Sequence, residues 1–288
     1  MSETVYACGF NGFQQLLPEG PPVLERLSRL PGVDRILDST WSGLEYANSD
    51  MCQHRGYSSS ARTHRYIWKT DEIRMTYASG RGVHLMDGSV WEVRGERWTQ
   101  IAGEVYAGHS HFLALTLDGE VYAWGDTRFG QLGLDRPIGT EAITHPEVIT
   151  ALQGLRMLDI ACGSFHSVVL AETGDIYTFG WNKHGQLGLG DTQDPEVDLG
   201  GPQLVNFPAG GEVNVQSIAC GTHHTVVLDD AHRVWATGWG KWGQCGEKRS
   251  QSTFHPLLLP STASAGALHI RCGPWCTFVR VSDKQKGE

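Results

Sequence analysis

The chain has 288 residues, and its 23 Lys and Arg residues against 32 Asp and Glu residues give a formal net charge of −9. This balance argues against a basic nucleic-acid-binding body, which needs an excess of cations to neutralise phosphates. Glycine (36 residues) and tryptophan (10 residues) are abundant, which indicates many tight turns around large hydrophobic anchors. At this length, such a composition favours one large β domain over two ordinary domains.

Neither a membrane segment nor a disulfide framework is predicted. No apolar run approaches the length of about 18 residues that crosses a bilayer, and residues 1–4 lack a basic and then apolar leader. The seven cysteines are odd in number and have no Cys-x-x-Cys spacing, so neither disulfides nor a zinc ribbon are indicated. We therefore expect a protein of the nucleus or the cytoplasm that contacts no membrane.

An internal repeat organises the sequence from residue 107 onward. The segment 162–170 (CGSFHSVVL) is echoed by 220–228 (CGTHHTVVL) and by 107–115 (AGHSHFLAL), and each copy continues into a second block that ends in Gly-Gln-Leu-Gly or Gly-Gln-Cys-Gly. Successive copies are 55 and then 58 residues apart, in both blocks. The glycines that mark this spacing are Gly108, Gly163 and Gly221 in the first block and Gly125, Gly180 and Gly238 in the second.

Weaker copies extend the repeat in both directions. Residues 82–91 compress the pattern, and residues 38–44 keep a trace of it. The C-terminus supplies only a first block, at 272–279, whereas the N-terminus supplies only a second block, at 5–12. Together the two ends make one complete unit, as expected if a ring closes by pairing its termini.

Within a unit the residues predict short strands. Residues 166–170 and 176–180 are β-branched and aromatic runs joined by a turn at 172–175, which indicates a hairpin. A third strand is predicted before each leading glycine, at 158–161 and 215–219, and the Gly-Gln-Leu-Gly segment is predicted to add the outermost strand. Four antiparallel strands per unit, repeated radially, describe a β-propeller blade.

The recurring Gly-x-x-His, Trp-Gly-x-Asn and Gly-Gln-Leu-Gly motifs resemble the repeats of the regulator of chromosome condensation family. The resemblance covers nearly the whole chain, strongly over 98–280 and thinly over 18–80. It implies an all-β fold, a β-propeller of four-stranded antiparallel blades that is closed by its N- and C-terminal strands. Seven blades are expected, one or two of them degenerate, in a single domain at 1–281, followed by a disordered tail at 282–288.

Histidines and cysteines at shared repeat positions are interpreted as structural. His111, His166 and His224 recur once per blade, so the ring separates them and they cannot share one metal. Cys162, Cys220 and Cys272 share another position and are expected to be small buried fillers. Residues 238–243 spell G-x-G-x-x-G, but no helix start follows, as a dinucleotide site would require. We therefore expect no catalytic residues, no metal and no cofactor, and we do not expect an enzyme.

One edge of the propeller is the predicted binding surface. In an antiparallel meander, the connection between the first two strands leaves the sheet at the same edge as the connection between the last two. This edge would carry Trp, Phe and Arg side chains, which dominate binding hot spots, although any single aromatic here more often wedges between blades. The predicted partner-binding rim comprises Phe10, Arg128, Phe129, Trp181, Lys183, His184, Trp239, Lys241, Trp242 and Trp275.

The resemblance implies a non-catalytic protein-interaction scaffold that acts as a monomeric subunit and contacts no nucleic acid directly. Similarity to small single-domain members of the family implies an adaptor for a chromatin-linked JmjC oxygenase, a histone demethylase. Similarity of residues 5–9 and 238–246 to the fungal killer-toxin-insensitivity propeller implies instead a partner of a small zinc protein in diphthamide synthesis and Elongator-dependent tRNA modification. A further alternative is guanine-nucleotide exchange on a Ran-like GTPase, the activity of the founding member.

Overall fold

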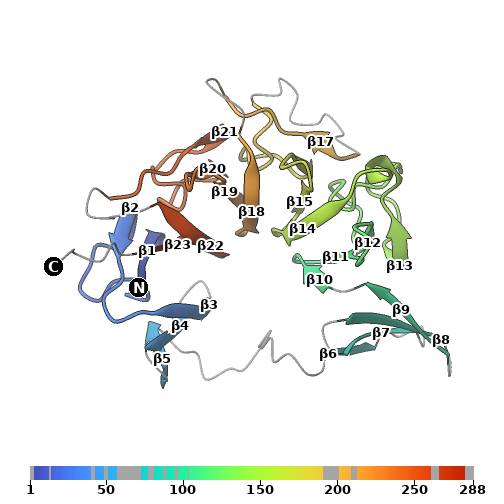
Figure 1. Cartoon of the computed structure of the whole chain (residues 1–288), viewed down its shortest axis with the longest axis horizontal. Helices are drawn as coiled ribbons and strands as arrows, with labels where there is room; N and C mark the ends of the chain where they lie inside the picture. The colour runs from blue at the N-terminus through green and yellow to red at the C-terminus, as the bar shows by residue number, and fades with distance from the viewer. Residues whose placement is uncertain are drawn as a thin grey trace.

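The computed structural model describes residues 3–12, 14–39, 43–48, 51–56, 73–76, 81–86, 89–94, 97–102, 104–190, 201–208, 213–260 and 266–282. These residues form 23 strands and one short 3-10 helix, η1 (Thr150–Leu152). The strands make six antiparallel sheets, five of four strands and one of three. Figure 1 shows the sheets arranged around a common centre, so the expected all-β propeller of four-stranded blades is confirmed.

We number the sheets as blades around the ring, beginning with the blade that contains strands from both ends of the chain. Blade 1 contains strands from both ends of the chain: β22 (Ala267–Gly273), β23 (Cys276–Ser282), β1 (Glu3–Phe10) and β2 (Val23–Arg29). Blade 2 contains β3 (Arg35–Ser39), β4 (Gly43–Asn48) and β5 (Met51–Gly56). Blade 3 contains β6 (Ile73–Thr76), β7 (Arg81–Met86), β8 (Ser89–Arg94) and β9 (Arg97–Ala102).

The remaining three blades carry the clear sequence repeats. Blade 4 contains β10 (Glu104–Ala107), β11 (His111–Leu115), β12 (Val121–Gly125) and β13 (Ile143–Val148). Blade 5 contains β14 (Met157–Cys162), β15 (His166–Ala171), β16 (Ile176–Gly180) and β17 (Gln203–Leu204). Blade 6 contains β18 (Val215–Cys220), β19 (His224–Asp229), β20 (Val234–Gly238) and β21 (Gln251–Pro256).

The two ends of the chain pair as the sequence predicts. Strand β1 runs antiparallel to β23, from Glu3 opposite Ser282 to Gly9 opposite Cys276, and it lies between β23 and β2 in the sheet. Strand β23 thus extends one residue into the segment predicted to be a tail, and residues 283–288 lie outside the described residues. The sequence leads to an expectation of seven blades, whereas the described residues form six, and between 18 and 80 they form β2, blade 2 and the start of blade 3.

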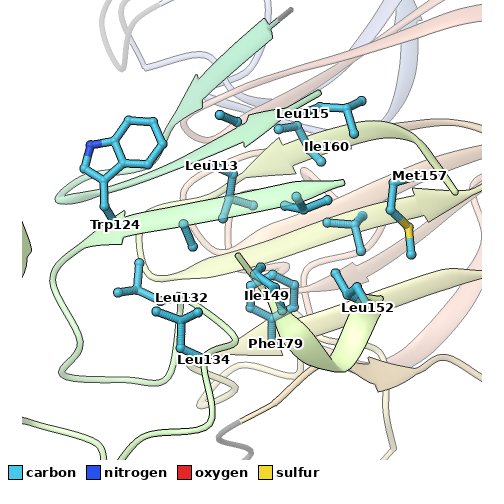
Figure 2. Close-up of a cluster of buried hydrophobic side chains, with 14 of the residues drawn as sticks. Leu113, Leu115, Trp124, Leu132, Leu134, Ile149, Leu152, Met157, Ile160 and Phe179 are labelled. Atoms are coloured by element: carbon cyan, nitrogen blue, oxygen red, sulfur yellow. The ribbon is translucent and has the colours of Figure 1, made fainter. Parts of the chain in front are cut away.

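Hydrophobic side chains of neighbouring blades pack against each other, and this packing forms the core. Figure 2 shows the cluster between blades 4 and 5, where Phe179 from β16 packs with Leu132 and Ile149 of blade 4. Phe179 is fully buried. Because a blade buries both faces against its neighbours, the second strands of blades 5 and 6, HSVVLA (β15) and HTVVLD (β19), are buried at every residue.

The outermost strand of each blade differs from the sequence prediction. The Gly-Gln-Leu-Gly segment is a turn, and the fourth strand begins later, at Ile143 in blade 4, Gln203 in blade 5 and Gln251 in blade 6. The turn has a physical reason, because Gln131 and Gln186 are fully buried. The Oε1 atom of Gln186 accepts a hydrogen bond from the backbone N–H of His184, at 2.9 Å, and thereby closes a tight loop.

Candidate functional site: the aromatic rim

A buried seam of histidines supports the rim from below. The ring of His166 in blade 5 reaches blade 6, where its Nε2 lies 3.1 Å from the Oγ1 of Thr225. The Thr225 hydroxyl donates to the carbonyl oxygen of Gln186 in blade 5, at 2.7 Å. Because that hydroxyl has only one hydrogen, it must accept from His166, and the imidazole is the neutral tautomer that carries its proton on Nε2.

The same relay recurs at the junctions on either side. His111 of blade 4 pairs with Ser167 of blade 5, at 2.9 Å, and His224 of blade 6 pairs with Thr277 of blade 1, at 3.1 Å. The two hydroxyls donate to the carbonyl oxygens of Gln131 and Gln244, at 2.8 and 2.7 Å. Each relay therefore ties one blade to the next with two hydrogen bonds.

The repeat glycines make room for these histidines. A Cβ on Gly163 would lie 2.0 Å from the His166 Cε1 and 2.8 Å from the carbonyl oxygen of Gly221, and Gly108 and Gly221 meet their own histidines in the same way. Gly125, Gly180 and Gly238, at the other repeat position, have positive φ angles of 111°, 102° and 104°, which favour glycine.

Burial keeps the seam histidines neutral. It lowers the pKa of His111 to about 4, and together with the smaller effect of neighbouring histidines it lowers the pKa of His166 and His224 to about 3. Burial also raises the pKa of the Cys162 thiol to about 12 and places the pKa of Cys220 and Cys272 well above the usual value. At neutral pH the three imidazoles are therefore uncharged and the three thiols protonated.

The loops above the seam form one continuous edge. In blades 1, 4, 5 and 6 the loop after the third strand is bound to the loop between the first and second strands, for example by the Trp181 N–H donating to the Phe165 carbonyl at 2.8 Å. The loops between first and second strands are in turn bonded from blade to blade, because Ser164 N–H donates to the Thr222 carbonyl at 3.1 Å. The two kinds of loop therefore share one edge, as the meander argument predicts.

Aromatic and histidine rings gather on this edge in two clusters, which together with their flanking cations we call the aromatic rim. The wide cluster crosses blades 4, 5 and 6, and its adjacent ring centroids are 5.1 to 6.0 Å apart. It comprises His109, Phe129, Phe165, Trp181, His184, His223 and Trp239. The narrow cluster joins Phe10, Trp242 and Trp275 of blades 1 and 6, with centroids 5.0 to 6.2 Å apart.

Apart from the exposed His109, the rings of the rim are partly buried, so a ring can both wedge between blades and present a surface to a partner. Trp181 contacts Phe129 of blade 4 and His223 of blade 6, and thus wedges between blades while part of its surface remains accessible. Burial and then the charge of His184 lower the pKa of His223 to about 4, and burial and Lys183 lower the pKa of His184. Both imidazoles are therefore neutral aromatic surfaces at physiological pH.

Three exposed cations flank the rings. The Arg128 guanidinium is held by Asp126, with its Nε 2.8 Å and its Nη2 2.6 Å from Oδ2. Partial burial opposes ionisation of Asp126, but hydrogen bonds from Arg128 and Ser110 prevail and lower its pKa. The Lys241 Nζ lies 5.0 Å from the centre of the Trp242 ring, and Lys183 is exposed beside His184.

The structure brings together every residue predicted for the rim, but divides them into two clusters. The prediction did not assign a role to Asp126, which orients Arg128; its position directly after Gly125 is the signal that could have identified it. Among the described residues no group of three or more His, Cys, Asp and Glu side chains could hold a metal ion. No described helix is long and apolar enough to cross a membrane.

Radial four-stranded sheets, closure by the terminal strands and a ring-lined rim define a β-propeller of the protein-interaction class. A profile of the regulator of chromosome condensation (RCC1) repeat matches residues 118–170, 173–228 and 231–280, and a second profile of this repeat matches 104–131 and 158–186. The matches span more than half of the sequence, and the chain belongs to the RCC1 repeat family.

Relatives and solved structures agree with this assignment. RCC1 domain-containing protein 1 of Mus musculus is 36% identical in an alignment of 215 positions that covers 62% of this chain and 55% of that protein. The Homo sapiens protein is 34% identical in an alignment of 222 positions that covers 64% of this chain and 57% of that protein. The chain thus spans little more than half the length of these relatives. Prp20p of Saccharomyces cerevisiae has the same fold, with a TM-score of 0.76 at 14% identity over 99% of this chain and 93% of that one.

Proposed function

We propose that this chain is a non-catalytic adaptor and that the aromatic rim binds its protein partner. The observation that carries the proposal is the wide cluster, seven rings in contact across three blades with exposed cations beside them. Large aromatic side chains and arginine supply most of the energy at protein interfaces, because they bury much surface for few rotatable bonds.

The rim is ordered before any partner arrives. Each ring in the wide cluster is held by contacts to at least one other, and the loops beneath it are hydrogen-bonded within and between blades. Arg128 is fixed by a two-pronged ion pair to Asp126. A partner would therefore lose little conformational entropy of this surface on binding, which favours affinity.

The flanking cations indicate the charge of the partner. Arg128 and Lys241 are exposed on a chain whose net charge is −9, so the rim contrasts in sign with the protein as a whole. Such local complementarity steers association and selects partners. We expect the bound surface to combine an apolar centre with acidic side chains at its edge.

For the identity of the partner, the sequence resemblance and the similarity to RCC1 domain-containing protein 1 favour a chromatin-linked JmjC oxygenase. The chain would act as a monomeric subunit in the nucleus or the cytoplasm. The crystal structure of Prp20p was described together with its binding properties to Gsp1p and histones; for this chain, exchange on a Ran-like GTPase is the weaker alternative. A small zinc protein of the diphthamide and Elongator pathways is the other.

The test compares two variants with equal loss of charge. Arg128, Lys183 and Lys241 are replaced by alanine in the rim variant, whereas Arg136, Arg156 and Lys248, which are exposed cations in ion pairs and outside both ring clusters, are replaced in the control. Tagged wild type and both variants are purified from native cells, and the co-purifying proteins are quantified by mass spectrometry. A stoichiometric JmjC protein that the rim variant loses and the control keeps is the expected result.

Other outcomes redirect the proposal. A small zinc protein or Elongator subunits lost in the rim variant would keep the docking surface and change the partner. A partner retained by the rim variant would refute docking on this rim. Acceleration of nucleotide release from a panel of Ran-like GTPases would refute the purely non-catalytic adaptor.

A further inference from the structure

A second feature, a cavity of about 340 Å³, lies between blade 1 and blade 2. Its apolar wall is formed by Val5, Ile36 and Phe278. Four nitrogen-bearing side chains complete the described lining, and these are Arg35, His269, Arg271 and Arg280. A chain with net charge −9 thus places three guanidinium groups and an imidazole around one small space.

Strand register explains why these side chains converge. His269 of β22 pairs with Arg280 of β23, which pairs in turn with Val5 of β1, so the three form one row across blade 1. Arg271 pairs with Phe278 in the next row on the same face. Blade 2 supplies the opposite wall from the start of β3, and the Arg271 Nη1 donates to the Ile36 carbonyl at 2.7 Å, which orients its guanidinium at the cavity.

The repeat shows that these cations replace packing residues. Arg280 occupies the position of Leu170 in blade 5 and Leu228 in blade 6, because each pairs with the residue just after the same β-bulge. Arg271 likewise corresponds to Ala161 and Ala219. Leu170 and Ala161 belong to the apolar cluster between blades 5 and 6. Blade 1 has therefore exchanged aliphatic packing for positive charge.

Three arginines line the same small space, so one oxyanion would meet more than one guanidinium group there. Guanidinium groups bind phosphate oxygens through paired, charge-assisted hydrogen bonds. The cavity volume is at the lower end of the range for small-molecule sites and exceeds what an inorganic anion fills. The apolar wall calls for a ligand that also carries a hydrophobic portion.

We propose that this cavity is a binding site for a phosphate monoester with an apolar substituent. The site lies at the opposite edge of the blades from the aromatic rim, because β23 begins at Cys276 beside the rim and reaches Arg280 only near its far end. Binding here is independent of partner docking on the rim, and the rim variant defined above should bind the phosphate ligand unchanged.

The test uses phenyl phosphate as the probe and thermal shift with calorimetry as the readouts, at constant ionic strength. Wild type should bind phenyl phosphate and be stabilised by it, since a ligand that binds only the folded state raises its stability. Phenol and chloride should not do so. The double variant Arg271→Ala and Arg280→Leu installs the residues that other blades carry, and we expect it to fold and to weaken binding at least about 10-fold.

A matched pair of single variants tests the site even if the double variant does not fold. Arg35→Gln removes the exposed cation at the start of β3, whereas Arg156→Gln removes an exposed arginine that immediately precedes β14 and lies in an ion pair with Glu172. We expect weaker phenyl phosphate binding for the first and unchanged binding for the second. Absence of binding to wild type, or equal binding to wild type, the double variant and Arg35→Gln, would overturn the site.

The source of the phosphate is settled by a second comparison. Free phosphotyrosine and phosphotyrosine within a short peptide are titrated against wild type. Tighter binding of the peptide assigns the site to a phosphorylated protein segment, and exclusion of the peptide with retention of the free compound assigns it to a small metabolite. Failure of both to bind would contradict the proposal.

Discussion

Two junctions between blades show how one repeat serves two purposes. At the junction of blades 5 and 6, His166, Thr225 and Gln186 form the buried relay, and aliphatic side chains fill the space below it. At the junction of blades 1 and 2, Cys276 occupies the histidine position, since it pairs with Gly9 as His166 pairs with Gly180, and the space contains arginines around a cavity. The proposed phosphate site thus lies at the junction whose packing departs from the repeat, as expected when function is grafted on a fold.

Deletion of residues 1–12 is expected to have the largest effect, because it breaks the blade that borders the cavity. It removes β1 from between β23 and β2, together with the buried side chains of Val5, Tyr6 and Cys8. Each large buried side chain contributes about 1.5 to 3 kcal/mol, and β2 loses its partner. We expect loss of the cooperative thermal transition, and aggregation through the opened edge.

Circular dichroism measures the thermal melting of this deletion. The control is a deletion of residues 283–288, which belong to the tail predicted from the sequence. An N-terminal deletion with the same melting curve as wild type would refute closure by the terminal strands.

The second-largest effect is expected from acid, which should weaken the blade junctions that contain His111, His166 and His224. The pKa of His166 is lowered to about 3 and that of His111 to about 4, whereas an unfolded histidine has a pKa near about 6.5. The unfolded state therefore binds more protons below that pH, so the stability is complete above about 6.5 and falls as the pH drops towards 4, by about 1.4 kcal/mol per pH unit for each seam histidine. Urea unfolding at a series of pH values measures the slope.

The variant His166→Gln provides the control for this slope. The variant should be less stable than wild type at neutral pH. In acid its free energy of unfolding should fall less steeply with pH, because unfolding takes up about one proton fewer. An unchanged slope would show that His166 is not the group responsible.

Leu170→Arg imports the blade 1 residue into the junction of blades 5 and 6. Leu170 is 2% exposed in an apolar cluster, and an unpaired buried charge costs about 3 to 5 kcal/mol. Chemical denaturation should show a loss of this size, with Leu170→Met as the volume-matched control. Tolerance of the arginine would mean that the two junctions do not differ in packing.

The reverse exchange, Arg280→Leu, should have the smallest effect. It restores the leucine that blades 5 and 6 carry at this position, so we expect the free energy of unfolding to stay within about 1 kcal/mol of wild type or to rise. The same denaturation assay measures it without added phosphate. A loss as large as that of Leu170→Arg would indicate that Arg280 is required for folding and does not serve a ligand.

The strands and their closure could be predicted from the sequence because the repeat carries them. Alternating and continuous apolar runs specify strands directly, and the half-units at the two ends specify the pairing of β1 with β23. The fourth strand was misplaced because Gln186 resembles a strand residue, although its side chain turns inward to bind the backbone of His184. Sequence periodicity does not reveal such a capping contact.

The rim and the cavity also differ in how far the sequence predicts them. The rim could be predicted because meander geometry assigns loops to an edge, whatever their residues. The cavity was missed because an arginine in a strand is usually solvent-exposed, and nothing in β22 alone shows that Arg271 faces another blade. Alignment of Arg271 with Ala161 and Ala219 was the available signal, since a cation at a position that is otherwise small and apolar departs from the repeat.

The antiparallel pairing of β1 with β23 also determines how the molecule responds to tension. Glu3 lies opposite Ser282, so these ends of the two closing strands are neighbours, on the side away from the aromatic rim. A force applied between these ends would separate the strands one residue pair at a time, as a zip opens, instead of shearing all their hydrogen bonds at once. A propeller anchored by both ends would thus open at low load, whereas a pull between residues 9 and 282 would meet the whole ladder.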